Sequence, residues 1–259
     1  MAVLATLAGA DRAFASAWVP EPGKGEIISG YVSVDADRAI GSRGETIVLD
    51  GYGKRVTQTF ATVGVRPNWA LVGTFDWQTG SITQSGQTIR FSEPSSITAG
   101  LQYQISRREG HATSLSLSYV EGIDLPDALL TVENRLASIE ARGYWGESRT
   151  WLGRNMFLEG QLAGRLRLSG GYDSAYTQIT SGVDVTDRLL LMGKLRVAHI
   201  ASGRVSGILA PRQIRRESEA SAVLRVRDND FLELSASTVL GGRNTVRERQ
   251  IKLGYWRKF

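Results

Sequence analysis

The chain has 259 residues, of which 42% are hydrophobic, and it carries a formal net charge of +5. No stretch approaches the roughly 20 apolar residues of a membrane-spanning helix, which excludes a helical membrane protein but not a β-barrel, whose strands alternate apolar with polar residues. The lack of cysteine excludes a disulfide scaffold, and 29 glycines with only 6 prolines and 3 methionines favour strands joined by tight turns.

The beginning of the chain has the features of a secretory signal. An apolar run of ten residues is followed by Ala-Ser-Ala at 15–17, which is an A-x-A-like cleavage site. Asp11 and Arg12 interrupt this pattern and no basic segment precedes it, so a short disordered leader is the alternative. We predict that residues 1–17 are the remnant of a signal peptide and that 18–259 form one domain, starting at Trp18.

From residue 25 onward, apolar residues recur at every second position, which is the period of a β-strand. In one clear case, Leu101 and Tyr103 share a face opposite Gln102 and Gln104. About twelve segments show this alternation, each long enough for a tilted strand to cross a bilayer. They are 26–37, 54–66, 70–80, 96–106, 112–122, 134–146, 155–169, 173–186, 189–201, 216–227, 231–240 and 247–259.

The expected connections alternate in length, as they do in outer-membrane barrels with short periplasmic turns and longer outer loops. The short ones are 66–69, 106–112, 186–188 and 228–230, and the long ones are 38–53, 81–95, 123–133 and 202–215. Two links break the rule, because 170–172 is too short and 147–154 is too long. Apart from these two links, the pattern predicts a barrel with short turns at one end and long loops at the other.

One segment also fits a helix. In 125–142, Leu125, Leu129, Val132 and Leu136 are spaced by three or four residues, and a proline follows the first of them. We predict a loop at 123–133 and a strand at 134–146, with a short helix in that loop as the alternative.

The last strand carries a recognisable signal. Counting back by twos from the terminal Phe259, the outward positions include Tyr255, Leu253 and Ile251, while Arg257 departs from the apolar face and can reach headgroups by snorkelling. This resembles the terminal strand of bacterial outer-membrane proteins, which the barrel-assembly machinery recognises. The resemblance implies that machinery and outer-membrane lipid as partners. We predict an all-β fold, a transmembrane antiparallel up-and-down β-barrel of about 12 strands in the outer membrane of a Gram-negative bacterium.

Aromatic placement supports the same fold. Tryptophans at predicted strand ends match the aromatic belts of membrane interfaces, with ordinary core tryptophans as the alternative. They are Trp69, Trp77, Trp145, Trp151 and Trp256.

A looser resemblance lies in residues 17–25 (AWVPEPGKG) and 182–191 (GVDVTDRLLL), within a similarity that covers 135–201. These segments resemble porin-like outer-membrane proteins grouped near the "MetA-pathway of phenol degradation" family. The resemblance implies a barrel and its location, not a substrate.

Catalytic and metal-binding patterns are missing. His111 and His199 have no serine or aspartate at motif spacing. The acidic pairs at 35–37 and 228–230 are not followed by a calcium loop. We expect no enzyme activity, no metal and no cofactor. We also expect no nucleic-acid partner, because the basic residues alternate with aliphatic rather than aromatic ones.

If the apolar faces contact lipid, the charged residues line the interior. The candidate lumen residues are Arg142, Arg165, Arg167, Lys194, Arg196, Arg225, Arg227, Lys252, Glu140, Glu159 and Glu233. A water-filled lumen with these charges predicts a porin-like channel that transports small polar or anionic solutes. Alternatively, ion pairs fill a narrow, non-conducting barrel that anchors or docks a surface or secretion partner. The sequence leaves the solute and the oligomeric state open.

Overall fold

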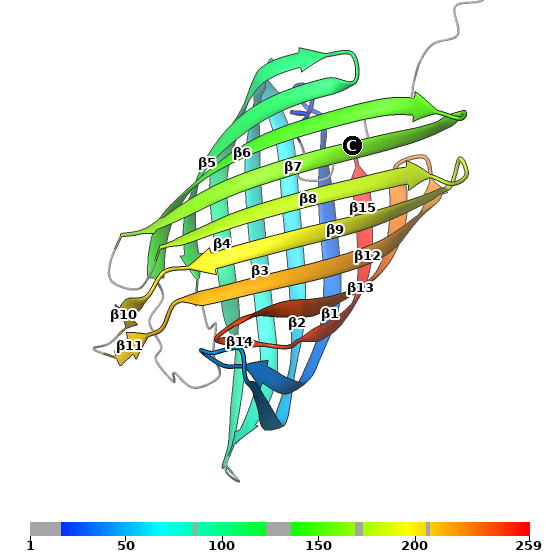
Figure 1. Cartoon of the computed structure of the whole chain (residues 1–259). Helices are drawn as coiled ribbons and strands as arrows, with labels where there is room; N and C mark the ends of the chain where they lie inside the picture. Colours follow the sequence, from blue (N-terminus) through cyan, green and yellow to red (C-terminus); the bar gives the residue numbers. More distant parts are fainter. Residues whose placement is uncertain (1–16, 85–86, 123–135, 169–172, 206–207) are drawn as a thin grey trace, which may run out of the picture.

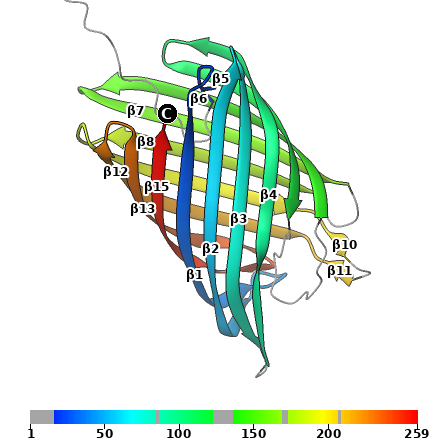
Figure 2. The same cartoon turned by 180° about the vertical axis from the view of Figure 1, so that it is seen from behind.

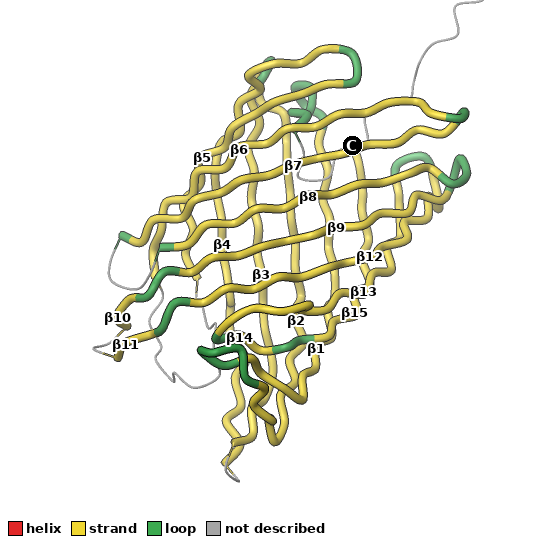
Figure 3. Tube along the Cα trace, viewed as in Figure 1, coloured by secondary structure: helices red, strands yellow, loops and turns green. Residues whose placement is uncertain are grey.

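The computed structural model describes residues 17–84, 87–122, 136–168, 173–205 and 208–259, and every regular element in them is a strand (Figure 3). The strands are β1 (Gly25–Ile40), β2 (Thr46–Arg66), β3 (Trp69–Gln84), β4 (Gln87–Arg108), β5 (His111–Gly122), β6 (Leu136–Trp151), β7 (Arg154–Arg167), β8 (Ser174–Asp184), β9 (Leu189–Ile200), β10 (Gly203–Val205), β11 (Ile208–Ala210), β12 (Gln213–Arg227), β13 (Asp230–Arg243), β14 (Thr245–Val246) and β15 (Arg249–Lys258). No helix in these ranges could span a membrane.

Twelve long strands close into one antiparallel barrel, as the sequence predicted (Figures 1 and 2). Each strand pairs with its sequence neighbours along the wall, apart from the short β10, β11 and β14. The last strand, β15, closes the ring by pairing with β1 over ten residues, from Glu26 opposite Lys258 to Asp35 opposite Arg249. Closure leaves the long strands without a free sheet edge through the lipid, where unpaired backbone groups would be costly.

Both ends of the barrel chain lie at one rim, which also carries the tight turns (Figure 1). We call this rim the turn end and the opposite one the loop end. The turns at 67–68, 109–110, 185–188 and 228–229 match the predicted short links. The link 147–154 is wrong as a loop, because β6 and β7 continue through it to a turn of Leu152 and Gly153. By the convention of outer-membrane barrels, the turn end faces the periplasm.

Two predicted long loops are also wrong. Most of 38–53 and 81–95 is strand, because β1 and β2 pair as far as Ile40 opposite Thr46, and β3 and β4 as far as Gln84 opposite Gln87. These ends project past the lipid, where both faces meet water, so apolar alternation stops while the backbone ladder continues. In 202–215 the chain forms the β10–β11 hairpin and the start of β12.

The helical alternative for 125–142 is wrong from residue 136 onward, where the chain is strand β6. Its remainder, like the loop at 123–133 and the link at 170–172, lies outside the described residues.

The aliphatic ladders face outward. Leu162 is 64% exposed, whereas its neighbour Ala163 is 3% exposed, and Leu195 and Leu224 point outward in the same way. On β3 the apolar band is bounded by Trp69 and Trp77, both exposed. Their spacing of eight residues is about 26 Å along the strand, or about 20 Å along the membrane normal for a tilt of about 40°, which is comparable to the roughly 25 Å of an outer-membrane apolar belt.

Candidate functional site: the barrel lumen

The inner face differs between two halves of the wall. Along β1 to β5 it is mostly small and uncharged, with Val32, Val34 and Ala36 on β1 and Ser114 and Ser116 on β5, all buried. Along β6 to β15 it is rich in charged side chains that alternate with the outward aliphatics.

Four arginines and one glutamate from β6 to β9 form a basic patch that we call the arginine wall (Arg142, Arg165, Arg167, Arg196 and Glu140). The Glu140 carboxylate accepts from Arg142 Nη2 at 2.6 Å and from Arg165 Nη2 at 2.9 Å. Arg167 Nη1 donates to Ser138 Oγ at 2.8 Å, and Arg196 Nη2 donates to the Gln178 amide oxygen at 3.0 Å. Four cations and one anion give this patch a formal charge of +3 (4 − 1).

Toward the turn end, charges occur in closer balance. Lys194 Nζ lies 2.8 Å from Glu219 Oε1. Lys252 Nζ lies 2.8 Å from Glu233 Oε2, which also accepts from the indole of Trp256 at 3.1 Å. Such pairing offsets the cost of removing charges from water.

The other candidate residues are Glu159, Arg225 and Arg227. Glu159 on β7 is buried on the inner face. Arg225 faces inward, with its guanidinium 5.9 Å from the centre of the Phe231 ring. Arg227 does not line the lumen wall, because β12 has a bulge between these two arginines and Arg227 is exposed at the end of the strand. Their roles in permeation stay predictions.

An apolar layer lines part of the inner wall near the turn end. Its buried residues are Leu190, Met192, Val223, Phe231 and Trp256. Ile28 on β1 and Phe157 on β7 pack against the two ends of this layer. It follows neighbouring strands from β7 through β9, β12, β13 and β15 to β1, which is half of the ring.

Trp256 corrects a prediction from the sequence. It is 4% exposed and points into the lumen, so its assignment to the lipid interface is wrong, whereas Trp69, Trp77, Trp145 and Trp151 are exposed outside as expected. The sequence analysis missed the whole layer. Its signal was the unbroken apolar run at 189–192, which places apolar side chains on both faces of β9.

Residues 17–24 form a strap across the rest of the turn-end mouth. The backbone N–H of Val19 donates to Gln104 Oε1 at 2.8 Å, and Gln104 Nε2 donates to the carbonyl oxygen of Ala17 at 2.8 Å. The ring of Trp18 lies so close to Gly146 that a Cβ there would overlap the indole. Since Gln104 is on β4, Gly146 is on β6 and the strap leads into β1, it crosses the barrel interior.

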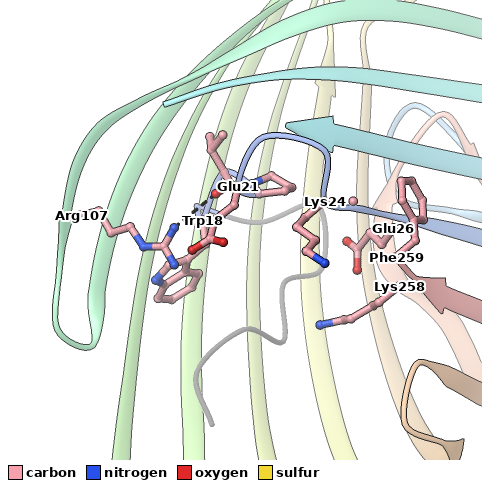
Figure 4. Close-up of a pocket in the computed structure, with 10 residues that line it drawn as sticks. Trp18, Glu21, Lys24, Glu26, Arg107, Lys258 and Phe259 are labelled. Atoms are coloured by element: carbon pink, nitrogen blue, oxygen red, sulfur yellow. Dashed lines mark hydrogen bonds between the residues drawn. The ribbon is translucent and has the colours of Figure 1, made fainter. Parts of the chain in front are cut away.

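The strap leaves a pocket of about 230 Å³ beside it (Figure 4). Arg107 and Trp18 lie on one side of this pocket, and Lys24, Lys258 and Phe259 lie on the other. Glu26, between the two lysines, is buried, and one of its carboxylate oxygens has no hydrogen-bond partner among the described groups. Together, strap and apolar layer narrow the turn end.

A second network of ion pairs and hydrogen bonds lies at the loop end, outside the apolar belt. Glu248, between β14 and β15, accepts from Tyr52 Oη at 2.6 Å and lies 3.0 Å from Lys54 Nζ and 2.7 Å from Arg215 Nη2. Burial by itself raises the pKa of the Glu248 carboxyl, but the positive charges of Lys54 and Arg215 and the hydrogen bonds outweigh it and lower the pKa to about 2. The carboxylate thus ties β2 to β12 across the seam of β1 and β15.

The remaining candidate chemistry is dispersed. His111 on β5 lies edge-on to Trp145, with ring centroids 6.4 Å apart, and His199 is exposed on β9. Asp35 binds Arg249 at 2.8 Å on the outer surface. Among the residues that the structure describes, no three histidine, aspartate or glutamate side chains gather as metal ligands.

Solved structures share this architecture. The COG4313 outer membrane channel from Pseudomonas putida F1 aligns with a TM-score of 0.69 at 13% identity, over 93% of this chain and 97% of that one. The translocator domain of the autotransporter NalP from Neisseria meningitidis aligns with a TM-score of 0.55 at 9% identity, over 92% and 90%. The KdgM porin, solved with a disordered oligogalacturonate, aligns with a TM-score of 0.52 at 8% identity, over 90% and 99%.

At 8–13% identity, these TM-scores show a shared fold. The chain has the fold of an outer-membrane β-barrel. Its outward apolar belt and its fold are those of proteins that reside in the bacterial outer membrane. No family model and no curated protein matches the sequence, so the resemblance to the "MetA-pathway of phenol degradation" family stays a prediction.

Proposed function

We propose that this barrel is a non-enzymatic channel for small polar or anionic solutes. The observation that carries the proposal is the arginine wall, where four guanidinium groups and one carboxylate line one side of the lumen. Arg196 is exposed to the interior and donates to a neutral amide, so its charge is available to a passing anion. Rings and tracks of cationic side chains select anions in pores. One similar barrel was solved with an oligogalacturonate, a polycarboxylate, which suits such a wall.

A non-conducting barrel that anchors or docks a partner is the second candidate. It is favoured by the strap and the apolar layer, which together narrow the turn end. The fold likeness to an autotransporter translocator domain fits this alternative as well.

Planar-bilayer recording of the refolded chain separates the two. A channel gives step conductance, and in a KCl gradient the sign of its reversal potential indicates preference for chloride. An intact, heat-modifiable barrel without steps contradicts the channel and supports the anchor. A preference for cations would support a channel but contradict the proposal that the arginine wall selects anions.

We also propose that Ile251, Leu253, Tyr255 and Phe259 serve as the assembly signal. Ile251, Leu253 and Tyr255 face outward, whereas Phe259 borders the turn-end pocket and exchanges two backbone hydrogen bonds with Gly25 at the seam. Phe259→Ala should lower the folded fraction in outer membranes, whereas Leu240→Ala, an outward aliphatic on β13, should leave it unchanged.

Processing after Ala17 is a further proposal, supported by the Ala-Ser-Ala motif. Amino-terminal sequencing of the protein from outer membranes should give Trp18. A mature chain that retains Ala17 would contradict this cleavage site.

A further inference from the structure

The β6–β7 hairpin projects at the turn end and exposes an unusual tip. Beyond residue 148 of β6 and residue 156 of β7, the backbone pairing joins only these two strands. Trp151 is 64% and Leu152 is 80% exposed there.

Basic side chains accompany these apolar ones on the outward face. Trp151 pairs with Arg154 and Arg149 pairs with Met156 in the register. Both arginines are exposed, and the Arg149 side chain, 79% exposed, lies 3.2 Å from the Glu147 carboxylate. Tryptophan beside arginine at the edge of an apolar belt is the pairing that phospholipid headgroups favour.

A groove on the lipid-facing surface lies further along the same two strands. It has a volume of about 400 Å³ and crosses the outer face of β4 to β8. Gly143 and Gly160 form its floor, and Leu115, Trp145 and Leu162 are among its walls. Because the two glycines carry no side chain, the wall is recessed at the depth of the acyl chains.

The spacing of groove and tip matches one lipid leaflet. Gly160 and Arg154 are six residues apart on β7, which is about 20 Å along the strand. A strand tilted by about 45° covers roughly 14 Å along the membrane normal over that length, and one leaflet of hydrocarbon is about 15 Å thick. An acyl chain that lies in the groove and follows the tilt of the strands therefore brings its phosphate to the arginines.

We propose that this surface binds one anionic phospholipid of the periplasmic leaflet. Its acyl chain occupies the groove beside Gly143 and Gly160, and its phosphate contacts Arg149 and Arg154. The site is separate from the lumen and does not depend on the channel function.

The test uses the full chain refolded into phosphatidylcholine vesicles that contain brominated phosphatidylglycerol or brominated phosphatidylcholine, with quenching of tryptophan emission as the readout. The wild type should bind phosphatidylglycerol more tightly than phosphatidylcholine. The double variant Arg149→Gln with Arg154→Gln should remove this preference. Each arginine should account for about a fivefold difference in affinity for phosphatidylglycerol. Arg55→Gln, an exposed outward arginine of β2 at the loop end, is the matched control and should behave as wild type.

Gly160→Leu fills the groove and should weaken binding of both lipids while preserving their ratio. Heat-modifiability confirms that each variant is folded. Equal binding of the two lipids by the wild type overturns the proposal, as does a preference that survives in the double variant. Unchanged binding in Gly160→Leu overturns the acyl-chain half of the site.

Discussion

The two halves of the barrel wall share one outer surface and differ in their inner one. Outside, β3 and β7 both present aliphatic and aromatic side chains, such as Leu71 and Leu162, because lipid demands this of every strand. Inside, β1 carries Val32 and Val34, whereas β7 carries Arg165 and its neighbours. Lipid thus fixes the outward residues, and the inward residues are left to determine what the lumen does.

The largest effect is expected from variants that remove the difference in charge between the two inner faces. Arg165→Glu with Arg167→Glu should reverse the anion preference of the lumen, because the arginine wall then carries −1 in place of +3. Reversal potentials in a KCl gradient measure it. Gln58→Glu, on the exposed inner face of β2, is the control on the neutral half and should shift the potential less. Unchanged selectivity in the double variant would place these arginines outside the permeation path.

The next prediction compares side-chain packing in the apolar layer with packing on the neutral half of the wall. Trp256→Ala in the apolar layer should lower the free energy of unfolding by about 3–5 kcal/mol. Val34→Ala, buried in the opposite half, removes two methyl-sized groups and should cost about 1.5 kcal/mol. Urea titrations in detergent measure both. Equal losses would mean that the layer packs no better than the neutral wall.

The loop-end network gives a pH-dependent difference. Glu248→Gln should destabilise the barrel by roughly 3 kcal/mol at neutral pH, because Lys54 and Arg215 lose their buried partner. The folded-state pKa is lowered from 4.5 to about 2, so the stabilisation is present above pH 4.5 and is lost as the pH falls toward 2. Midpoints of heat modification for both proteins should therefore converge over this range. A difference that is constant with pH would contradict the ionic role of Glu248.

The smallest effect distinguishes two turns. Leu152 has φ 49° on the β6–β7 turn, while Asn68 has φ 68° on the β2–β3 turn. Leucine is strained in this left-handed region and asparagine tolerates it. Leu152→Gly should stabilise the barrel by about 1 kcal/mol, and Asn68→Gly by less. A loss of stability in Leu152→Gly would show that its side chain contributes contacts worth more than the strain.

The sequence by itself determined the barrel, its twelve long strands and the direction of its faces. In a strand that crosses lipid, apolar and polar side chains must alternate, so the positions of Leu162 and Arg165 in the sequence are enough to assign them to opposite faces. This alternation is required only where the strand contacts lipid. Where β1 to β4 leave the membrane as paired strands, the pattern ends before the strands do, and the predicted loops at 38–53 and 81–95 were wrong for that reason.

The tertiary structure alone decided how the lumen is filled. The contact between the strap and Gln104 joins the start of the chain to β4, and the apolar layer collects residues from neighbouring strands, and no local period encodes either. The same holds for the sharing of Glu140 by two arginines and of Glu248 by a lysine and an arginine. Periodicity gives each side chain its face, but register and closure bring partners from different strands together.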